Sequence, residues 1–66
     1  MPRFNSTAIA AAEYNASTRI LQIWFVESGG PYSYYGVPAA IFEGLCNSRS
    51  KGGYFNDHIR DRYSVG

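Results

Sequence analysis

The segment with the most groups that could contact a ligand is Ser50–Tyr63. It holds three of the six Lys and Arg residues, the one histidine and three aromatic residues of a 66-residue chain. The beginning of this segment and the residue before it combine cations with small residues, in the order Arg49, Ser50, Lys51, Gly52 and Gly53. Free N–H groups at the start of a helix, with cations beside them, suit a phosphate group. The order of residues is not that of a P-loop, and a helix cap at Ser50 followed by a glycine-eased turn accounts for the same residues.

A second pair of cations, Arg60 and Arg62, follows in the same segment. Guanidinium groups can clamp a phosphate through two parallel hydrogen bonds, although surface ion pairing is the ordinary role of such residues. The candidate stacking surfaces for a base are Trp24, Tyr35 and Tyr54. One stacked base contributes about 1–3 kcal/mol; the alternative for Trp24 and Tyr35 is burial under the N-terminal arm or a second subunit. Together with the loop, these residues form the predicted ligand-binding site.

Catalytic and metal-binding chemistry is poorly represented. Cys46 and His58 are the only thiol and the only imidazole, and nucleophilic catalysis needs such a pair in contact with a third, orienting group. Cys46 falls on the flank of a predicted helix beside Phe42, which favours a packed thiol. One Cys, one His and scattered carboxylates lack the spacing of metal ligands. We therefore expect no enzymatic activity, no metal site and no cofactor.

The net charge and its distribution along the chain indicate which kinds of partner the protein could bind. The net charge is +1, too small for a protein that follows a long phosphate backbone. Residues 49–66 carry four cations and two carboxylates, a balance of +2, whereas residues 1–48 carry two cations and three carboxylates, a balance of −1. The C-terminal third is therefore the electropositive end.

Cysteine content and length predict location and assembly. A single cysteine cannot form an intrachain disulfide, which indicates a reducing compartment. No window approaches the roughly 18 apolar residues of a membrane span. We expect a cytoplasmic protein with no membrane partner. Because a chain this short has a marginal core, we also expect self-association, most simply as a homodimer.

Three strands are predicted in the first half of the chain. Residues 6–14 are assigned as a strand because residues 20–27, which alternate and are rich in β-branched and aromatic side chains, need a pairing partner. Gly29-Gly30 supplies the chemistry of a two-residue hairpin turn before a third strand over residues 32–35. This turn sets Phe25 opposite Tyr34. One face of the hairpin then carries Leu21, Ile23, Phe25 and Tyr34, and the other carries Trp24, Val26, Ser33 and Tyr35.

Two helices are predicted in the second half. The first opens at Pro38 and ends near Asn47, with apolar residues at helical spacing. The second follows an N-cap at Ser50, and its inner face repeats every four residues through Phe55, Ile59 and Tyr63. On its outer face Asp57 and Asp61 form one stripe, and His58 and Arg62 another. Strands followed by helices predict an α+β domain: a three-stranded antiparallel sheet with two short C-terminal helices packed on one face.

Several short patterns run through nearly the whole chain. In order they are Ser6 and Ile9, Tyr14, Leu21-x-Ile23-x-Phe25, Tyr32-x-Tyr34, Val37-Pro38, Leu45, Ser50-x-Gly52-x-Tyr54-Phe55-Asn56-x-x-Ile59 and Tyr63. With these patterns the chain resembles the KTSC domain, a module found at the C-terminus of some lysyl-tRNA synthetases and as free-standing bacterial and phage proteins. The resemblance implies a single domain over residues 1–66 and a fold more than a function: no binding residues are established for the family, and RNA binding has been suggested from the synthetase association. A 66-residue chain with its own Met1 is similar to the stand-alone form.

Three functions of different classes fit these residues. A nucleotide-type ligand needs one or two stacking rings and two or three cations, and the chain has them. An RNA-binding accessory module needs the same groups along a continuous basic groove, and a protein-interaction or inhibitor module needs an exposed aromatic patch. We expect a small non-catalytic module that binds, and so sequesters, a nucleotide-type, phosphate-bearing ligand; the other two functions stay open.

Overall fold

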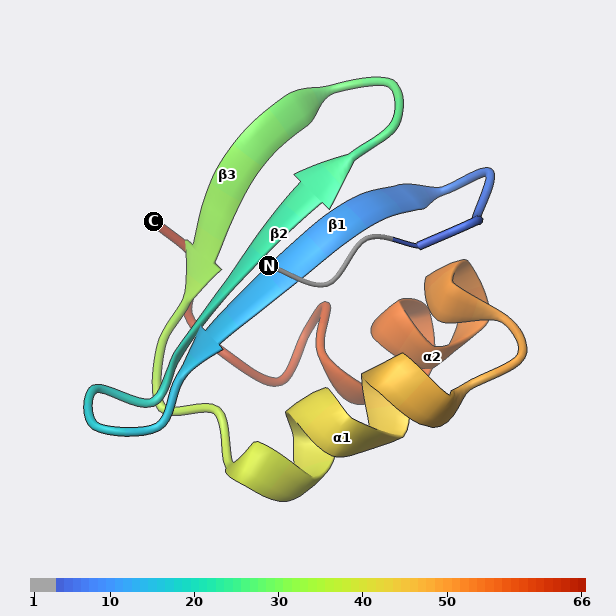
Figure 1. Ribbon diagram of the computed structural model, residues 1–66. Coiled ribbons are helices and arrows are strands. Elements are labelled where there is room, and N and C mark those ends of the chain that lie inside the picture. Colours follow the sequence, from blue (N-terminus) through green and yellow to red (C-terminus); the bar gives the residue numbers. More distant parts are fainter. Residues whose placement is uncertain (1–3) are drawn as a thin grey trace.

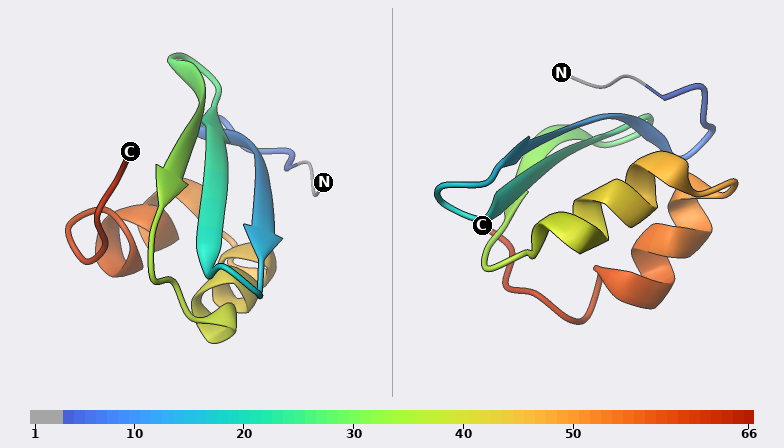
Figure 2. Two further views of the ribbon diagram at one scale, coloured as in Figure 1. Left: turned by 90° about the vertical axis from the view of Figure 1, so that its left-hand side faces the viewer. Right: turned by 60° about the horizontal axis from the view of Figure 1, so that its bottom comes forward.

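A three-stranded antiparallel sheet and two helices make up the computed structural model, which describes residues 4–66. The elements are β1 (Ile9–Asn15), β2 (Ile20–Phe25), β3 (Gly29–Tyr34), α1 (Ala39–Asn47) and α2 (Lys51–His58). The strand order is β1-β2-β3, so that β2 lies in the centre, and both helices cover the same face of the sheet (Figures 1 and 2). The predicted fold class is confirmed.

The core lies between the helices and one face of the sheet. In β2, Leu21 and Ile23 are fully buried, whereas the residues between and after them, Gln22 and Trp24, are only partly buried. This alternation follows from the two-residue repeat of a strand with one covered face. The other buried core residues are Ile9, Ala12, Tyr34, Val37, Leu45, Phe55 and Ile59. Leu21, Ile23, Phe25 and Tyr34 therefore face the core, as predicted.

The β2–β3 hairpin differs from the prediction in its turn. The turn is made by residues 26–28, and Gly29-Gly30 belong to β3. A side chain at Gly30 would place its Cβ 2.7 Å from the carbonyl oxygen of Ile23. Gly30 therefore permits a close approach of two strands at an irregularity in their pairing, and does not form the turn.

The corrected turn changes the register. Leu21 pairs with Tyr34, and Ile23 pairs with Tyr32, in place of the predicted pairing of Phe25 with Tyr34. The shift is by an even number of residues, which leaves each side chain on its predicted face because the side-chain period of a strand is two. The third strand also begins earlier and ends one residue before Tyr35.

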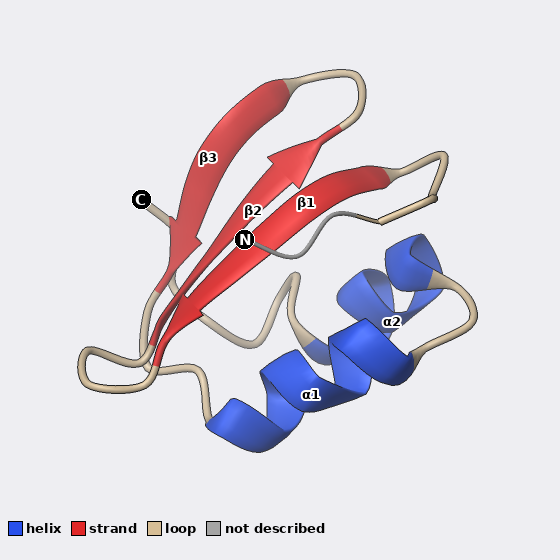
Figure 3. Cartoon of the chain, viewed as in Figure 1, coloured by secondary structure: helices blue, strands red, loops and turns tan. Residues whose placement is uncertain are grey.

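The second helix is shorter than predicted. Ser50 is its N-cap as expected, but α2 ends at His58, with Ile59 as its C-cap. The chain that follows α2 is mostly loop (Figure 3). Two glycines and the run Asn56-Asp57-His58 are weak helix formers, so a continued apolar spacing does not keep the backbone helical. The predicted surface stripes that pair Asp57 with Asp61 and His58 with Arg62 are therefore wrong.

The chain after α2 returns to the sheet. Residues 64–66, called here the C-terminal strand, run along the free edge of β3, where Val65 forms an antiparallel bridge with Tyr34. Three backbone hydrogen bonds with Ser33 and Tyr35 hold them in place. The segment is too short and too polar to be recognised as a strand from its composition.

Candidate functional site

The loop before α2 is a junction between structural elements. The hydroxyl of Ser50 accepts a hydrogen bond from the backbone N–H of Gly53 at 3.1 Å, which confirms the helix cap. The ammonium group of Lys51 donates to the carbonyl oxygens of Cys46 (2.9 Å), in the last turn of α1, and of Ser48 (2.6 Å), the C-cap of α1. The predicted phosphate-binding groups at this point are therefore partly occupied by contacts within the chain.

The N-terminal arm packs against this loop. A groove of about 590 Å³ separates residues 4–8 from residues 49–52. Lys51 lies over the ring of Phe4, with 5.0 Å between its Nζ and the ring centroid, and a Cβ at Gly52 would be 3.0 Å from the Cβ of Ala8. Arg49 is exposed beside this groove. Anion binding by Arg49 and the neighbouring amides stays a prediction.

Arg60 and Arg62 lie at the other end of α2. At 1.5 Å per residue the eight residues of the helix separate its two ends by roughly 12 Å. The guanidinium of Arg60 donates to Oδ1 of Asn56 at 3.5 Å, and Nε of Arg62 donates to the carbonyl oxygen of Asp57 at 3.3 Å. The four predicted cations therefore form two separate groups.

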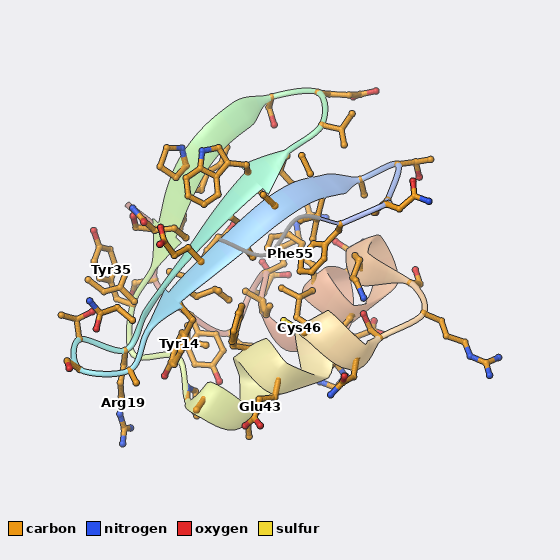
Figure 4. The ribbon with its side chains drawn as sticks, in the orientation of Figure 1. Tyr14, Arg19, Tyr35, Glu43, Cys46 and Phe55 are labelled. Carbon is orange, nitrogen blue, oxygen red and sulfur yellow. The ribbon has the colours of Figure 1, made fainter. Side chains whose placement is uncertain are left out.

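The three predicted stacking residues also lie apart. Trp24 lies on the open face of the sheet opposite Ala11, and Tyr35 is 46% exposed beyond the end of β3 (Figure 4). Because Tyr35 comes level with the first residue of β2, roughly 13 Å of strand separates it from Trp24. The row formed by Glu13, Gln22 and Ser33 lies between them.

Tyr54 is a packing residue between the helices. Its ring lies 4.4 Å from that of His58, centroid to centroid, and a Cβ at Gly44 of α1 would overlap the Tyr54 hydroxyl oxygen. Burial, and then the neighbouring Tyr63, raise the pKa of Tyr54. Its face is therefore not free to join Trp24 or Tyr35 in one stacking surface.

A different set of aromatic residues does converge. The aromatic groove, as we call it, has a volume of about 340 Å³ and lies between the β2–β3 hairpin, α2 and the C-terminal strand. It is lined by Phe25, Ser28, Tyr32, Tyr34, Phe55, Arg60 and Val65. The ring of Phe25 lies 5.1 Å from that of Phe55 and 5.4 Å from that of Tyr32, between centroids. The ring of Tyr34 lies 5.5 Å from that of Phe55.

The floor of the aromatic groove is buried and its rim is open. Tyr34 is 6% exposed and Phe55 lies between the sheet and the helices (Figure 4), whereas Tyr32 is 36% exposed. A planar group could therefore meet the rim ring directly, while the buried rings fix the position of the floor. Edge and face contacts between aromatic rings of this kind are favourable and geometrically specific.

The electrostatics of the groove depend on Arg60. It is the one charged residue among the described residues that line the groove, and its contact with Asn56 anchors it to α2. Burial raises the pKa of Tyr34, and Tyr32 adds to the rise, whereas the positive charge of Arg60 opposes it. The charge of Arg60 is therefore felt by the phenol of Tyr34 in the floor of the groove. The groove joins an aromatic surface to a cation.

Cys46 behaves as a packed thiol. Burial raises its pKa, the charge of Lys51 opposes that rise, and Glu43 adds to it. A neutral thiol is a weak nucleophile. Within residues 4–66, no three His, Cys, Asp or Glu side chains are grouped so that they could hold a metal ion.

The sequence patterns of the chain match a known family over most of its length. A family model described as the KTSC domain matches residues 5–63. The chain belongs to the KTSC domain family. The crystal structure of a KTSC domain protein from Yersinia pestis has the same fold, with a TM-score of 0.94 and 29% identity over 98% of this chain and 90% of that one.

The curated relatives that match this chain include one protein of similar length and two much longer ligases. A protein of Tsukamurella paurometabola is 35% identical over 96% of this chain and 92% of its own length. A lysine–tRNA ligase of Nostoc punctiforme is 37% identical over 86% of this chain, and one of Nostoc sp. is 38% identical over 83%. The chain spans only 10% of the length of either ligase. Across the described part of the chain, no helix has the length and apolar character needed to traverse a bilayer.

Three of the residues that line the aromatic groove were predicted from the sequence to face the core, and Arg60 was predicted to contact a phosphate. Phe25, Tyr34 and Phe55 belong to the patterns that identify the KTSC domain, and they do pack in the core. What sequence reasoning missed is that the exposed ring of Tyr32 and the cation of Arg60 join them. The alternation of Tyr32 and Tyr34 on one face of β3 is the signal that could have indicated this grouping.

Proposed function

We propose that this KTSC domain is a small non-catalytic module that binds a nucleotide-type, phosphate-bearing ligand in the aromatic groove. The observation that supports the proposal is the meeting of four aromatic side chains with one guanidinium, that of Arg60, in a single groove. An aromatic surface recognises a base by stacking, and a guanidinium recognises a phosphate by charge-assisted hydrogen bonds. The groove beside the loop combines Arg49 with a single ring, that of Phe4, which already lies under Lys51. Among the described residues, those that line the pocket on the open sheet face include no cation.

The size and chemistry of the groove suggest how such a ligand would lie. A volume of about 340 Å³ is near the lower end of the range for small-molecule sites, which suits one nucleotide. Its base would stack against Tyr32 and Phe25, its phosphate would meet Arg60, and the hydroxyl of Ser28 would supply a further hydrogen bond. One stacked ring at about 1–3 kcal/mol and one charged hydrogen-bonding pair at about 1.5–3 kcal/mol sum to about 2.5–6 kcal/mol. This sum corresponds to a Kd between tens of micromolar and about 10 mM.

We propose that the domain binds and releases its ligand without any chemical reaction. The described lining offers three hydroxyls and a guanidinium, and burial raises the pKa of Tyr34, so that its phenol stays protonated at neutral pH and is a poor general base. Sequestration of a nucleotide is the role that such a site would serve. A cytoplasmic location is part of the same proposal, because the single cysteine is an unpaired thiol.

A calorimetric titration with adenosine and uridine 5′-monophosphates tests the proposal. We expect Arg60→Ala to weaken binding about tenfold or more, because it removes a charge-assisted contact. Arg49→Ala is the matched control: it removes the same charge from the other group of cations and should leave affinity unchanged within about twofold. Equal losses in the two variants, or no loss in either, would count against the aromatic groove as the site.

RNA binding is the second candidate, favoured by the similarity to segments of two lysine–tRNA ligases. Salt dependence separates the two functions. Each phosphate contacted on a single strand adds about −0.7 to the slope of log affinity against log salt concentration. A mononucleotide should give a slope near that of one phosphate contact. An oligonucleotide that contacts the domain through several phosphates should give a slope several times steeper. If neither ligand binds, the protein-interaction function takes precedence.

A further inference from the structure

We propose that the C-terminal strand is a detachable wall of the aromatic groove, and that Val65 closes this wall over a planar anionic ring. The inference rests on the proposed function of the groove, and it adds a positioning residue and a moving part to that site. Val65 is the one aliphatic side chain among the described residues that line the groove.

The attachment of this strand is specific. Ser33 and Gly66 exchange two backbone hydrogen bonds, with N···O distances of 3.2 and 2.8 Å, and the N–H of Tyr35 donates to the carbonyl oxygen of Ser64 at 3.0 Å. The ring of Tyr35 adds a side-chain contact, since a Cβ at Gly66 would lie 2.8 Å from its hydroxyl oxygen. The strand therefore has one defined register on the edge of β3.

The attachment is also weak. It consists of three residues at a sheet edge, and Val65 is 54% exposed even when docked. Segments with few buried contacts and solvent-exposed backbone hydrogen bonds open with a small free energy, well below that of global unfolding. We therefore expect the strand to leave the edge of β3 while the rest of the domain stays folded.

Tyr34 couples the strand to the groove. Its backbone pairs with Val65 and its ring forms the floor. A ligand on that floor contacts Val65 only while the strand is docked, so it binds the docked state more tightly and shifts the population toward it. The strand in turn raises the affinity of the groove by the same factor.

Amide hydrogen exchange by NMR tests detachment without any ligand. Ser33 and Tyr35 direct their N–H groups to the C-terminal strand, whereas Tyr34 directs its N–H to β2, because successive residues of a strand face opposite edges. We expect the amides of Ser33 and Tyr35 to exchange at least tenfold faster than that of Tyr34. Exchange as slow as that of Tyr34 would overturn the proposal, because the strand would then be a fixed part of the sheet.

The coupling is tested with 2-naphthalenesulfonate, a planar ring system with one negative charge. It should slow exchange at Ser33 and Tyr35 in the wild-type chain. Gly66→Pro removes one N–H donor of the attachment, and its Cβ would lie 2.8 Å from the hydroxyl oxygen of Tyr35. It should therefore weaken binding of the probe at least fivefold, the factor that corresponds to one net hydrogen bond. Val65→Ala should weaken it by a similar factor through lost apolar contact. Ser64→Ala is the control, since it keeps all three backbone bonds.

The outcomes separate this inference from the proposed function. If the probe behaves as described but mononucleotides do not bind, the proposed function fails and the detachable wall stands. If mononucleotides bind in an Arg60-dependent manner and Gly66→Pro binds them as tightly as the wild type, the function stands and the wall is overturned. A probe that does not bind the wild-type chain, or that binds without slowing exchange at Ser33 and Tyr35, also overturns the inference.

Discussion

Replacement of Lys51 by methionine tests whether the loop before α2 is a structural junction. Lys51→Met keeps most of the length of the side chain and removes its charge and its N–H groups. The ammonium group donates to the carbonyl oxygens of Cys46 and Ser48 at the C-terminal end of α1, and lies over the ring of Phe4. All three contacts should be lost together.

The expected loss of stability is about 2 kcal/mol. Hydrogen bonds to a charged group contribute about 1.5–3 kcal/mol each when well buried; those of Lys51 are only partly buried, so each is placed near 0.7 kcal/mol. An exposed cation–π contact adds about 0.5 kcal/mol, and the attraction of a cation to the helix C-terminus is already included in the two hydrogen bonds to its carbonyl groups. For a chain of 66 residues, 2 kcal/mol corresponds to a fall in Tm of roughly 8–16 °C.

Urea denaturation followed by circular dichroism measures this difference. Arg49→Met is the matched control: Arg49 is exposed, so its replacement should change the free energy of unfolding by less than about 0.5 kcal/mol. If Lys51→Met and Arg49→Met prove equally stable, the ammonium group of Lys51 is not a cap, and the loop regains both of its cations for ligand binding.

Three further changes test other contacts. Gly44→Ala should destabilise by about 1 kcal/mol in urea denaturation although helix propensity alone predicts a gain of similar size, because its Cβ would displace the Tyr54 ring; a gain would show that the ring is free to move. Because burial raises the pKa of Tyr34, its neutral phenol contributes stability in full below about pH 10 and loses it as the pH rises further. Tyr34→Phe should therefore lessen the decline of Tm above pH 10, though not abolish it, since the pKa of Tyr54 is also raised; an unchanged decline would contradict the assignment. Cys46→Ser should lower stability by at most about 1 kcal/mol and leave mononucleotide affinity unchanged, and an altered affinity would reopen a role for the thiol.

The elements of the fold could be predicted from local signals. Period-two alternation in β2, the cap at Ser50 and the apolar spacing of α1 each depend on residues close in sequence. The first strand was predicted although its alanines favour a helix, because β2 needed a partner. These are the cases in which local pattern and tertiary pairing agree.

The structure differs from the sequence prediction where contacts between distant segments of the chain determine the local conformation. The glycines at 29–30 read as a turn because two glycines commonly form one, yet a close contact with Ile23 places them inside β3. The spacing of Phe55, Ile59 and Tyr63 reads as a helix, although the chain leaves α2 at Ile59 and brings Tyr63 to the core by an irregular path. Neither contact is visible in a local pattern.

The candidate site shows the same limit. The predicted site groups cations and aromatic rings by residue type alone. In the structure they are divided among the loop, the open sheet face and the end of α2. The aromatic groove is instead made by residues that look like ordinary core residues, plus Arg60 from beyond the helix end and Val65 from the C-terminal strand. Its formation depends on the return of the chain to the edge of β3, which residue types alone do not predict.

Chemical-shift mapping of a ¹⁵N-labelled sample during titration with adenosine 5′-monophosphate tests the central claim most directly. We expect the largest shifts at residues of the aromatic groove, with Tyr32, Tyr34 and Arg60 foremost, and little change at Arg49 and Gly52. Shifts confined to Arg49, Gly52 and the facing N-terminal arm would contradict the claim and assign the ligand to the loop before α2.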